Sequence, residues 1–101
     1  MKRSLQQLAN WLDADVQREE GVIVTGVAID SRVVKEGDLF IPFRGARANG
    51  HRFVRQAIED GAAASLWLKD EPNPPSDVPL IFVEDSERAI QQLASKYREE
   101  L

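Results

Sequence analysis

The sequence predicts a single α/β domain, with helices packed on a small parallel or mixed sheet. Three observations support this prediction. Short apolar runs of strand length alternate with longer segments whose apolar residues recur at helical spacing. Turn sequences rich in glycine, proline and aspartate separate these segments. A chain of 101 residues is long enough to bury one hydrophobic core but not two.

The first half of the chain begins with a helix and continues with strands. A capping-box pattern at residues 4–7 and leucines on one helical face predict a helix over residues 5–12. Residues 22–24 and 27–29 are apolar and largely β-branched, which predicts one bent strand or two short strands. Residues 39–43 form the next expected strand.

A second helix is expected over residues 50–60, and Gly61 is placed to end it in a left-handed conformation. The side chains expected on its buried face are those of Phe53, Val54, Ala57 and Ile58. Residues 62–68 are small and apolar, which predicts a buried strand on which a helix packs closely.

The rest of the chain is expected to form a loop, a strand and a long helix. Residues 69–79 hold four of the five prolines, so we expect a surface loop. Residues 80–83 predict a further strand. Asp85 is then placed to cap the final helix.

Charge and composition exclude several classes of function. The formal net charge is -4 and the isoelectric point is near 5.0, which argues against a nucleic-acid partner. No segment has the roughly 18 consecutive apolar residues of a membrane span, so we expect no membrane insertion. The lack of cysteine excludes disulfides and thiolate metal sites, and it fits a cytoplasmic location. The chain has a single histidine, which excludes a multi-histidine metal site.

Residues 39–58 form a basic island in this acidic chain. They contain no acidic residue and four arginines, whereas the rest of the chain sums to -8. The four are Arg44, Arg47, Arg52 and Arg55. The island covers an expected strand, loop and helix start, where backbone N–H groups and arginine side chains favour a bound anion. The alternative is a tight turn with a solvated basic face.

Gly45 and Gly50 have the spacing of the glycines in a phosphate-binding P-loop. His51 and Arg52 stand where that motif needs Lys and Ser or Thr, so we expect no nucleoside triphosphate hydrolysis at this loop. The pattern still predicts a turn that presents backbone N–H groups to an anion or a polar base. His51 has no evident Ser or Cys partner in the sequence, and we expect it to cap or pack rather than to catalyse.

Asp30, Ser31 and Arg32 form the second candidate site. They follow an apolar strand, at the end where α/β sheets usually bind ligands. The Ser31 hydroxyl both donates and accepts hydrogen bonds, which suits the edge of a pyrimidine. The alternative is that Asp30 and Arg32 only pair with each other or cap a turn.

These segments together resemble the N-terminal domain of the Mur ligase family. That family has a strand ending in Asp-Ser/Thr-Arg, a Gly-Asp-Leu-Phe strand start, a Gly-x-x-x-Asp-Gly-His-x-Phe loop and a Gly-Ala-x-Ala strand. The matching segments here are residues 30–32, 37–40, 45–53 and 61–64. The patterns occur in the same order and in register, and the resemblance extends from about residue 5 to the end of the chain.

The resemblance implies an ATP-dependent ligase of peptidoglycan synthesis that joins an amine to UDP-N-acetylmuramoyl-peptide. It is stronger to the branch that adds D-alanyl-D-alanine than to the branch that adds diaminopimelate or lysine. Residues 1–101 are then a single domain that binds the UDP end of the precursor, while the central ATPase and C-terminal domains lie outside this chain. We expect this fragment to bind without catalysing. ATP and magnesium are implied for the full-length enzyme, and no cofactor, metal or catalytic residue is expected in this domain.

The resemblance also implies a uridine and diphosphate site. Its residues are Ile29, Asp30, Ser31, Arg32, Gly45, Arg47, Ala48, Asn49, Gly50 and His51. Ser31 and the two residues before it are expected to contact the uracil. The chain departs from the family pattern at Asn49, where the family usually has Asp, and at residues 46–48, where the D-alanyl-D-alanine-adding branch often has Glu-Arg-Phe. Two other classes stay open: a stand-alone nucleotide- or sugar-phosphate-binding module, and a structural or interaction domain.

Overall fold

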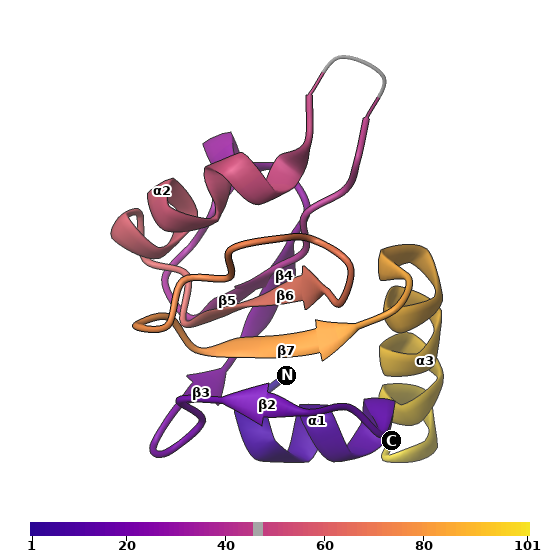
Figure 1. Ribbon diagram of the computed structural model, residues 1–101. Helices are drawn as coiled ribbons and strands as arrows, with labels where there is room; N and C mark the ends of the chain where they lie inside the picture. The colour runs from indigo at the N-terminus through magenta and orange to yellow at the C-terminus, as the bar shows by residue number, and fades with distance from the viewer. Residues whose placement is uncertain (46–47) are drawn as a thin grey trace.

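The protein is built around a mixed sheet with helices on both faces (Figure 1). In residues 1–45 and 48–101, which the computed structural model describes, the elements are β1 (Arg3–Ser4), α1 (Leu5–Leu12), β2 (Val16–Gln17), β3 (Ile23–Val24), β4 (Gly26–Ala28), η1 (Ser31–Val33), β5 (Asp38–Phe40), η2 (Gly50–Phe53), α2 (Val54–Glu59), β6 (Ala64–Leu68), β7 (Leu80–Val83) and α3 (Ser86–Glu99). The central sheet has the order β2-β7-β6-β5-β4. Its strands β4 to β7 run parallel and β2 runs antiparallel to β7, so the predicted α/β fold with a parallel or mixed sheet is confirmed as mixed.

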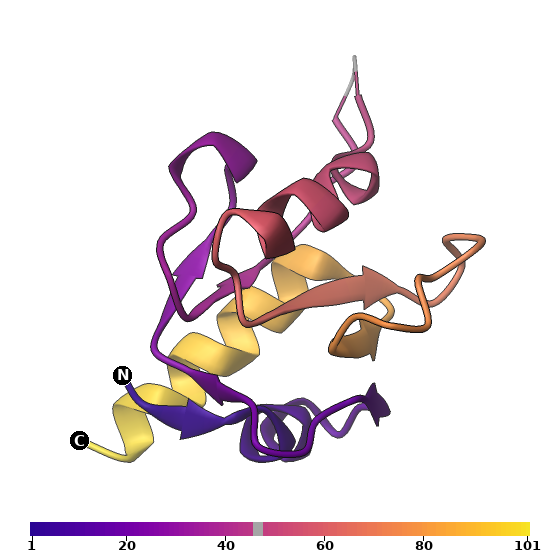
Figure 2. The ribbon, with the colours of Figure 1, turned by 90° about the vertical axis from the view of Figure 1, so that its left-hand side faces the viewer.

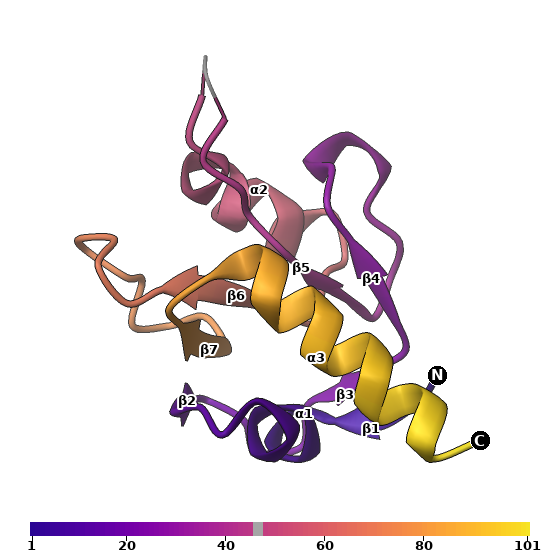
Figure 3. The same cartoon turned by 90° about the vertical axis from the view of Figure 1, so that its right-hand side faces the viewer.

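The sheet separates two apolar cores. Helices α1 and α3 cover one face and α2 covers the other (Figures 1 and 3). Side chains alternate along β5 and just beyond it, since Leu39 and Ile41 face α1 and α3 whereas Phe40 faces α2. All three are at most 2% exposed. Among the described residues, none of the helices combines the length and apolar character needed to cross a membrane.

Side-chain caps determine where α1 and α3 begin. The Ser4 hydroxyl oxygen accepts a 3.1 Å hydrogen bond from the backbone N–H of Gln7. Oδ1 of Asp85 accepts one of the same length from the backbone N–H of Arg88. Both caps agree with the sequence prediction, because each satisfies a backbone donor that the first turn leaves free.

The second helix differs from the sequence prediction in its first turn. Residues Gly50–Phe53 form the 3-10 helix η2, and the α-helix α2 starts only at Val54. A 3-10 helix has about 3.0 residues per turn rather than about 3.6, so its side chains leave the face predicted for an α-helix. Phe53 is consequently 37% exposed, and its predicted place on the buried face is wrong, whereas Val54 and Ala57 are buried as predicted.

A loop rather than a helix joins the parallel strands β6 and β7. Residues 69–79 make this connection, for which a helix is usual. Gln17 on β2 holds the loop, because its Nε2 donates 2.8 Å hydrogen bonds to the carbonyls of Pro75 and Val78. Val78 is buried in the core under α2. The predicted surface loop therefore replaces a covering helix over part of the sheet.

The parallel strands bring several loops to one edge of the sheet. The chain leaves β4 into η1, and beyond β5 it forms a hairpin whose described residues are Arg44, Gly45, Ala48 and Asn49, with Arg44 paired to Asn49. Figure 2 shows η1 and the described part of this hairpin on the same side of the sheet. Ligands of open α/β sheets usually bind at this edge.

Candidate functional site

A cleft opens at the carboxyl ends of β4 and β5. Its volume is about 580 Å³. The residues that line it come from the turn after β4, from β5, and from the hairpin and η2: Ile29, Asp30, Ser31, Arg32, Phe40, Phe43, Gly45, Ala48, Gly50 and Phe53. The two segments singled out in the sequence therefore face one common space.

Asp30 and Arg32 form a closed ion pair at one side of the cleft. Oδ1 of Asp30 accepts hydrogen bonds from the backbone N–H and Nε of Arg32, at 2.9 and 3.0 Å, and Oδ2 accepts one from Nη2 at 2.8 Å. These bonds lower the pKa of Asp30 to about 2. The pairing given as the alternative in the sequence analysis is thus present, and it fixes the turn that carries Ser31. The Ser31 hydroxyl makes no hydrogen bond to the described residues, so it is free to donate and accept in the cleft.

The remaining surfaces of the cleft are largely apolar. Phe40 is 2% exposed and lies at the base, while Phe43 is half-buried and Phe53 is 37% exposed. Ile29 contributes an aliphatic side chain that is 61% exposed. Apolar and aromatic surfaces beside a free hydroxyl suit a flat heterocycle, because its faces stack while its edge hydrogen-bonds.

The backbone donors of Gly45 and Gly50 are used within the hairpin and at its end. The N–H of Gly45 donates a 2.8 Å hydrogen bond to the carbonyl of Ala48, and the N–H of Gly50 donates one of 2.7 Å to the carbonyl of Phe43. A Cβ atom built on Gly50 lies 2.8 Å from the backbone nitrogen and 2.9 Å from the carbonyl oxygen of Phe43. Gly50 is therefore required by the close approach of two backbone segments.

The start of η2 is also closed by internal hydrogen bonds. Oδ1 of Asn49 accepts a 3.0 Å hydrogen bond from the backbone N–H of His51, and the Asn49 carbonyl accepts one of 3.2 Å from the N–H of Arg52. The expectation that this turn presents N–H groups to an anion is wrong for Gly45, Gly50 and these two residues. Their donors instead close the hairpin and cap the helix.

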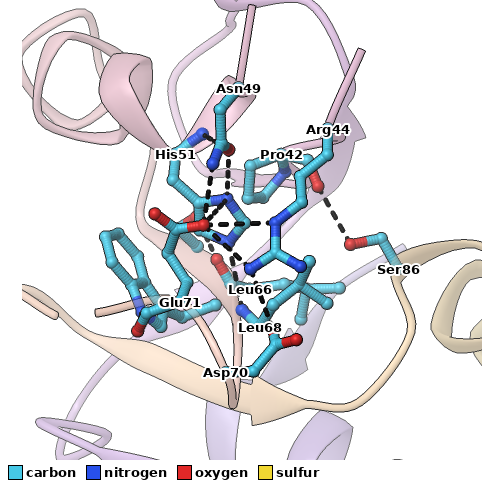
Figure 4. Close-up of polar contacts among 11 residues, drawn as sticks. Pro42, Arg44, Asn49, His51, Leu66, Leu68, Asp70, Glu71 and Ser86 are labelled. Carbon is cyan, nitrogen blue, oxygen red and sulfur yellow. Dashed lines mark hydrogen bonds and ion pairs between the residues drawn. The ribbon is translucent and has the colours of Figure 1, made fainter. Parts of the chain in front are cut away.

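His51 is a buried structural residue (Figure 4). Its side chain is 2% exposed, and its Nε2 accepts a 3.1 Å hydrogen bond from the backbone N–H of Leu68. The proton is therefore on Nδ1, which lies 2.6 Å from Oδ1 of Asn49. Trp67 stands edge-on to the imidazole, with the ring centroids 4.7 Å apart. Burial lowers the pKa of His51, while the carboxylate of Glu71 acts in the opposite direction.

Acidic residues of the β6–β7 loop neutralise much of the basic island. Nη2 of Arg44 lies 2.8 Å from Oδ1 of Asp70 and 2.9 Å from Oε1 of Glu71 (Figure 4). Arg55 pairs with Asp77 at 2.9 Å. Each acidic partner lies 22 to 27 residues from its arginine in the sequence. The positive charge of the island therefore has no nearby acidic partner when only the sequence is considered.

The structure divides the residues that the resemblance implies for the site. The following residues line the cleft: Ile29, Asp30, Ser31, Arg32, Gly45, Ala48 and Gly50. The side chains of Asn49 and His51 belong instead to a polar network with Glu71, and Arg47 lies outside the described residues. The sequence analysis did not single out Phe40, Phe43 and Phe53 for the site. Their position on both sides of the glycine-bounded loop was the available signal.

Comparison with known families decides the relationship. The family model described as "Mur ligase family, catalytic domain" matches residues 23–98. The chain belongs to the Mur ligase family. The resemblance carried by the motifs at residues 30–32, 37–40, 45–53 and 61–64 is thus confirmed.

Curated relatives of this Mur ligase chain include ligases with two different amine substrates in their names. The UDP-N-acetylmuramoyl-tripeptide--D-alanyl-D-alanine ligase of Bacillus subtilis is 41% identical over 103 residues, covering 100% of this chain and 22% of that protein. The UDP-N-acetylmuramoyl-L-alanyl-D-glutamate--2,6-diaminopimelate ligase of Bacteroides thetaiotaomicron is 37% identical over 82 residues, covering 81% and 17% respectively. The chain spans about a fifth of the length of these relatives.

Solved structures of MurF share the fold of this Mur ligase chain. Crystal structure I of MurF from Acinetobacter baumannii superposes with a TM-score of 0.82 at 24% identity, over 99% of this chain and 22% of that one. MurF ligase from Thermotoga maritima, in complex with ADP, gives 0.60 at 30% identity, over 72% and 16%. The predicted fold of a Mur ligase N-terminal domain is confirmed.

Proposed function

We propose that this domain binds the uridine diphosphate end of UDP-N-acetylmuramoyl-tripeptide within an ATP-dependent ligase that adds D-alanyl-D-alanine during peptidoglycan synthesis. The observation that carries the proposal is the cleft between the turn at residues 29–32 and the hairpin at residues 44–49. Membership of the Mur ligase family, and the relative that the chain matches over its full length, supply the substrate class.

The chemistry of the cleft matches a uridine. The Ser31 hydroxyl donates to a uracil carbonyl or accepts from the ring N–H, while Ile29 and Phe53 offer apolar surface to the faces of the base. The carboxylate of Asp30 is held by Arg32 and keeps the turn in place. Arg32, whose side chain is 86% exposed, and Arg47, which lies outside the described residues, supply positive charge for the diphosphate.

The role of the domain in the reaction is positioning. In the proposed enzyme ATP would supply the phosphoryl group that activates the precursor carboxylate, magnesium would neutralise the phosphate charge, and other domains would hold both. We expect no triphosphate at the loop after β5, because the backbone N–H groups of Gly45, Gly50 and His51 are used internally and the P-loop Lys is replaced by His51. Holding the nucleotide end lets remote binding energy orient the distant carboxylate. We expect this reaction to take place in the cytoplasm, because the proposed substrates are a nucleotide-linked precursor and ATP.

A second candidate is the ligase that adds diaminopimelate. The 37% identity to a relative with that name, over 81% of this chain, favours it as the alternative. An assay of ATP-dependent amide formation by the full-length enzyme distinguishes the two candidates. Only one of the two amines, D-alanyl-D-alanine or diaminopimelate, is expected to react with its matching UDP precursor.

An amide NMR titration of the 101-residue chain tests the proposed binding. We expect UDP, and then UDP-N-acetylmuramoyl-tripeptide, to shift the amides of residues 29–32 and of the described residues between 43 and 53. CDP carries the same diphosphate and is the matched control. A weaker response to CDP is expected, because its base presents an amino group in place of a carbonyl. Spectra that stay unchanged with both UDP ligands at millimolar concentration would contradict the proposal and favour a structural or interaction domain.

A further inference from the structure

Glu71 joins the two ends of the hairpin that borders the cleft (Figure 4). Its Oε1 accepts hydrogen bonds from Nε and Nη2 of Arg44, at 3.2 and 2.9 Å, and from Nδ2 of Asn49, at 2.7 Å. Arg44 and Asn49 are the paired residues at the base of the hairpin. One carboxylate oxygen from the β6–β7 loop therefore contacts both hairpin ends.

Glu71 is itself held in place by its backbone. Its N–H donates a 3.0 Å hydrogen bond to the carbonyl of Leu68 at the end of β6, and its carbonyl accepts one of 3.0 Å from Nε1 of Trp67. The Glu71 side chain is only 16% exposed. The hydrogen bonds from Asn49, and then from Arg44, lower the pKa of Glu71 and keep it ionised.

The hairpin contributes directly to the cleft. Gly45 and Ala48, which line it, are the neighbours in sequence of Arg44 and Asn49. The hydrogen bond from the Gly45 N–H to the Ala48 carbonyl lies one step beyond the pair that Glu71 contacts. Any movement of Arg44 relative to Asn49 therefore changes one wall of the cleft.

We propose that Glu71 is a positioning residue for nucleotide binding, which fixes the Arg44–Asn49 end of the hairpin so that Gly45 and Ala48 form a preorganised wall of the cleft. This inference rests on the proposed function and deepens it. Glu71 does not line the cleft, so it acts through Arg44 and Asn49 rather than by touching the ligand. Its contribution is the ordering of a binding surface before the ligand arrives.

Asp70 provides a matched control inside the same loop. It pairs with Arg44 at 2.8 Å, but its side chain is 77% exposed, and its described contacts do not include Asn49. Asp70→Ala thus removes one negative charge beside Arg44 and leaves the Glu71 contact with both hairpin ends. Glu71→Ala removes the same charge together with that contact. A difference between the two variants measures positioning rather than local charge.

The first test compares amide hydrogen exchange and UDP binding in these variants. We expect Glu71→Ala to speed exchange of the Gly45 and Gly50 amides about tenfold and to weaken UDP binding by about the same factor. Asp70→Ala is expected to change either quantity by about twofold or less, since an exposed ion pair contributes little. Unchanged amide shifts in β6 and β7 establish that each variant is folded. Equal effects of the two substitutions, or slow hairpin exchange in Glu71→Ala, would overturn the inference.

A negative charge introduced at Asn49 gives a second, independent test. Asn49→Asp keeps the acceptor that caps η2 but replaces the donor to Glu71 by a second carboxylate oxygen, so the two repel. We expect loss of hairpin protection and of UDP affinity by about tenfold or more. Adding Glu71→Gln restores a donor between the two positions and should return both quantities to within about twofold of the wild type. A double variant as defective as Asn49→Asp alone would overturn the inference.

The outcomes separate this inference from the proposed function. Hairpin exchange is measured without ligand, so it reports on Glu71 whether or not UDP binds. Normal UDP binding in Glu71→Ala refutes the positioning role and leaves the proposed function standing. If the wild type does not bind UDP while the hairpin amides of Glu71→Ala exchange rapidly, the proposed function is refuted. The role of Glu71 in nucleotide binding is then refuted as well, and Glu71 only stabilises the hairpin.

Discussion

The backbone N–H of Leu68 donates a 3.1 Å hydrogen bond to Nε2 of His51, which fixes the imidazole in its neutral form. The ring nitrogen that accepts this bond cannot also carry a proton. The charged groups around the ring are Glu71 and Asp70, which favour protonation, and Arg44, which opposes it. Burial dominates, so the pKa of His51 in the folded chain lies below its ordinary value of 6.5.

We therefore predict that the chain loses stability as the pH falls below about 6.5. The unfolded chain binds a proton at His51 near that pH, whereas the folded chain does so only at lower pH. The free energy of unfolding is thus highest above pH 6.5 and declines until the folded chain also binds the proton. His51 is the only histidine, so urea unfolding followed by circular dichroism between pH 5 and 8 isolates this effect. A stability that is flat across this range, or that rises on acidification, would refute the assignment.

Ser31→Ala is predicted to weaken UDP binding about fivefold, because it removes one neutral hydrogen bond worth about 1 kcal/mol. Stability should be unaffected, since the hydroxyl makes no hydrogen bond to the described residues. Ser95→Ala, at an exposed position on α3, is the matched control and should bind as the wild type does. Isothermal titration with UDP measures both. Equal affinity of the Ser31 variant and the control would remove Ser31 from the site.

Phe53→Ala is predicted to weaken UDP binding about tenfold, as expected for the loss of an aromatic surface against a base. The ring is 37% exposed and lines the cleft, so we expect little change in the denaturation midpoint. Val33→Ala removes an apolar side chain that is 64% exposed and lies outside this cleft, which makes it a suitable control. If the Phe53 variant unfolded markedly more easily while binding UDP normally, Phe53 would be a packing residue after all.

Gly50→Ala is predicted to destabilise the chain by about 2 kcal/mol, through overpacking against backbone that cannot move aside. The added methyl would lie 2.8 and 2.9 Å from the Phe43 backbone nitrogen and oxygen, and 3.1 Å from Cα of Pro42. Gly21→Ala is the control, because no heavy atom of the described residues beyond its two chain neighbours lies within 4 Å of a Cβ there. It should cost about 1 kcal/mol for its positive φ alone. Denaturant unfolding of both variants compares their free energies of unfolding. A Gly50 variant that is no less stable than the Gly21 variant would contradict the packing argument.

Elements with strong local signals could be predicted from the sequence. The helix Leu5–Leu12 and the strand Leu80–Val83 have their predicted bounds, because a cap marks one and a dense apolar run marks the other. The strands β1 and β2 were missed, since each has only two residues and is defined by pairing with β3 or β7. A strand of two residues is too short to show an alternation of apolar and polar side chains. Pairing with a distant strand therefore determines where β1 and β2 form.

The candidate site was predictable in its location and less so in its members. Parallel strands end at one edge of the sheet, which let the segments around Ser31 and Gly50 be placed together. The pairing of Arg44 with Glu71 was not predictable, because it joins two loops across 27 residues of sequence. The exposure of Phe53 was not predictable either, because periodicity does not distinguish a 3-10 first turn from an α-helical one.

The edge-on contact between Trp67 and His51 gives the protein an internal optical reporter. The chain has two tryptophans, and Trp67 is 5% exposed with its ring centroid 4.7 Å from that of the imidazole. A protonated imidazole quenches indole fluorescence by accepting an electron from the excited ring. Replacing Trp11, the other tryptophan, by phenylalanine would leave a single emitter whose intensity follows the charge of His51 in the intact protein, without denaturant or label.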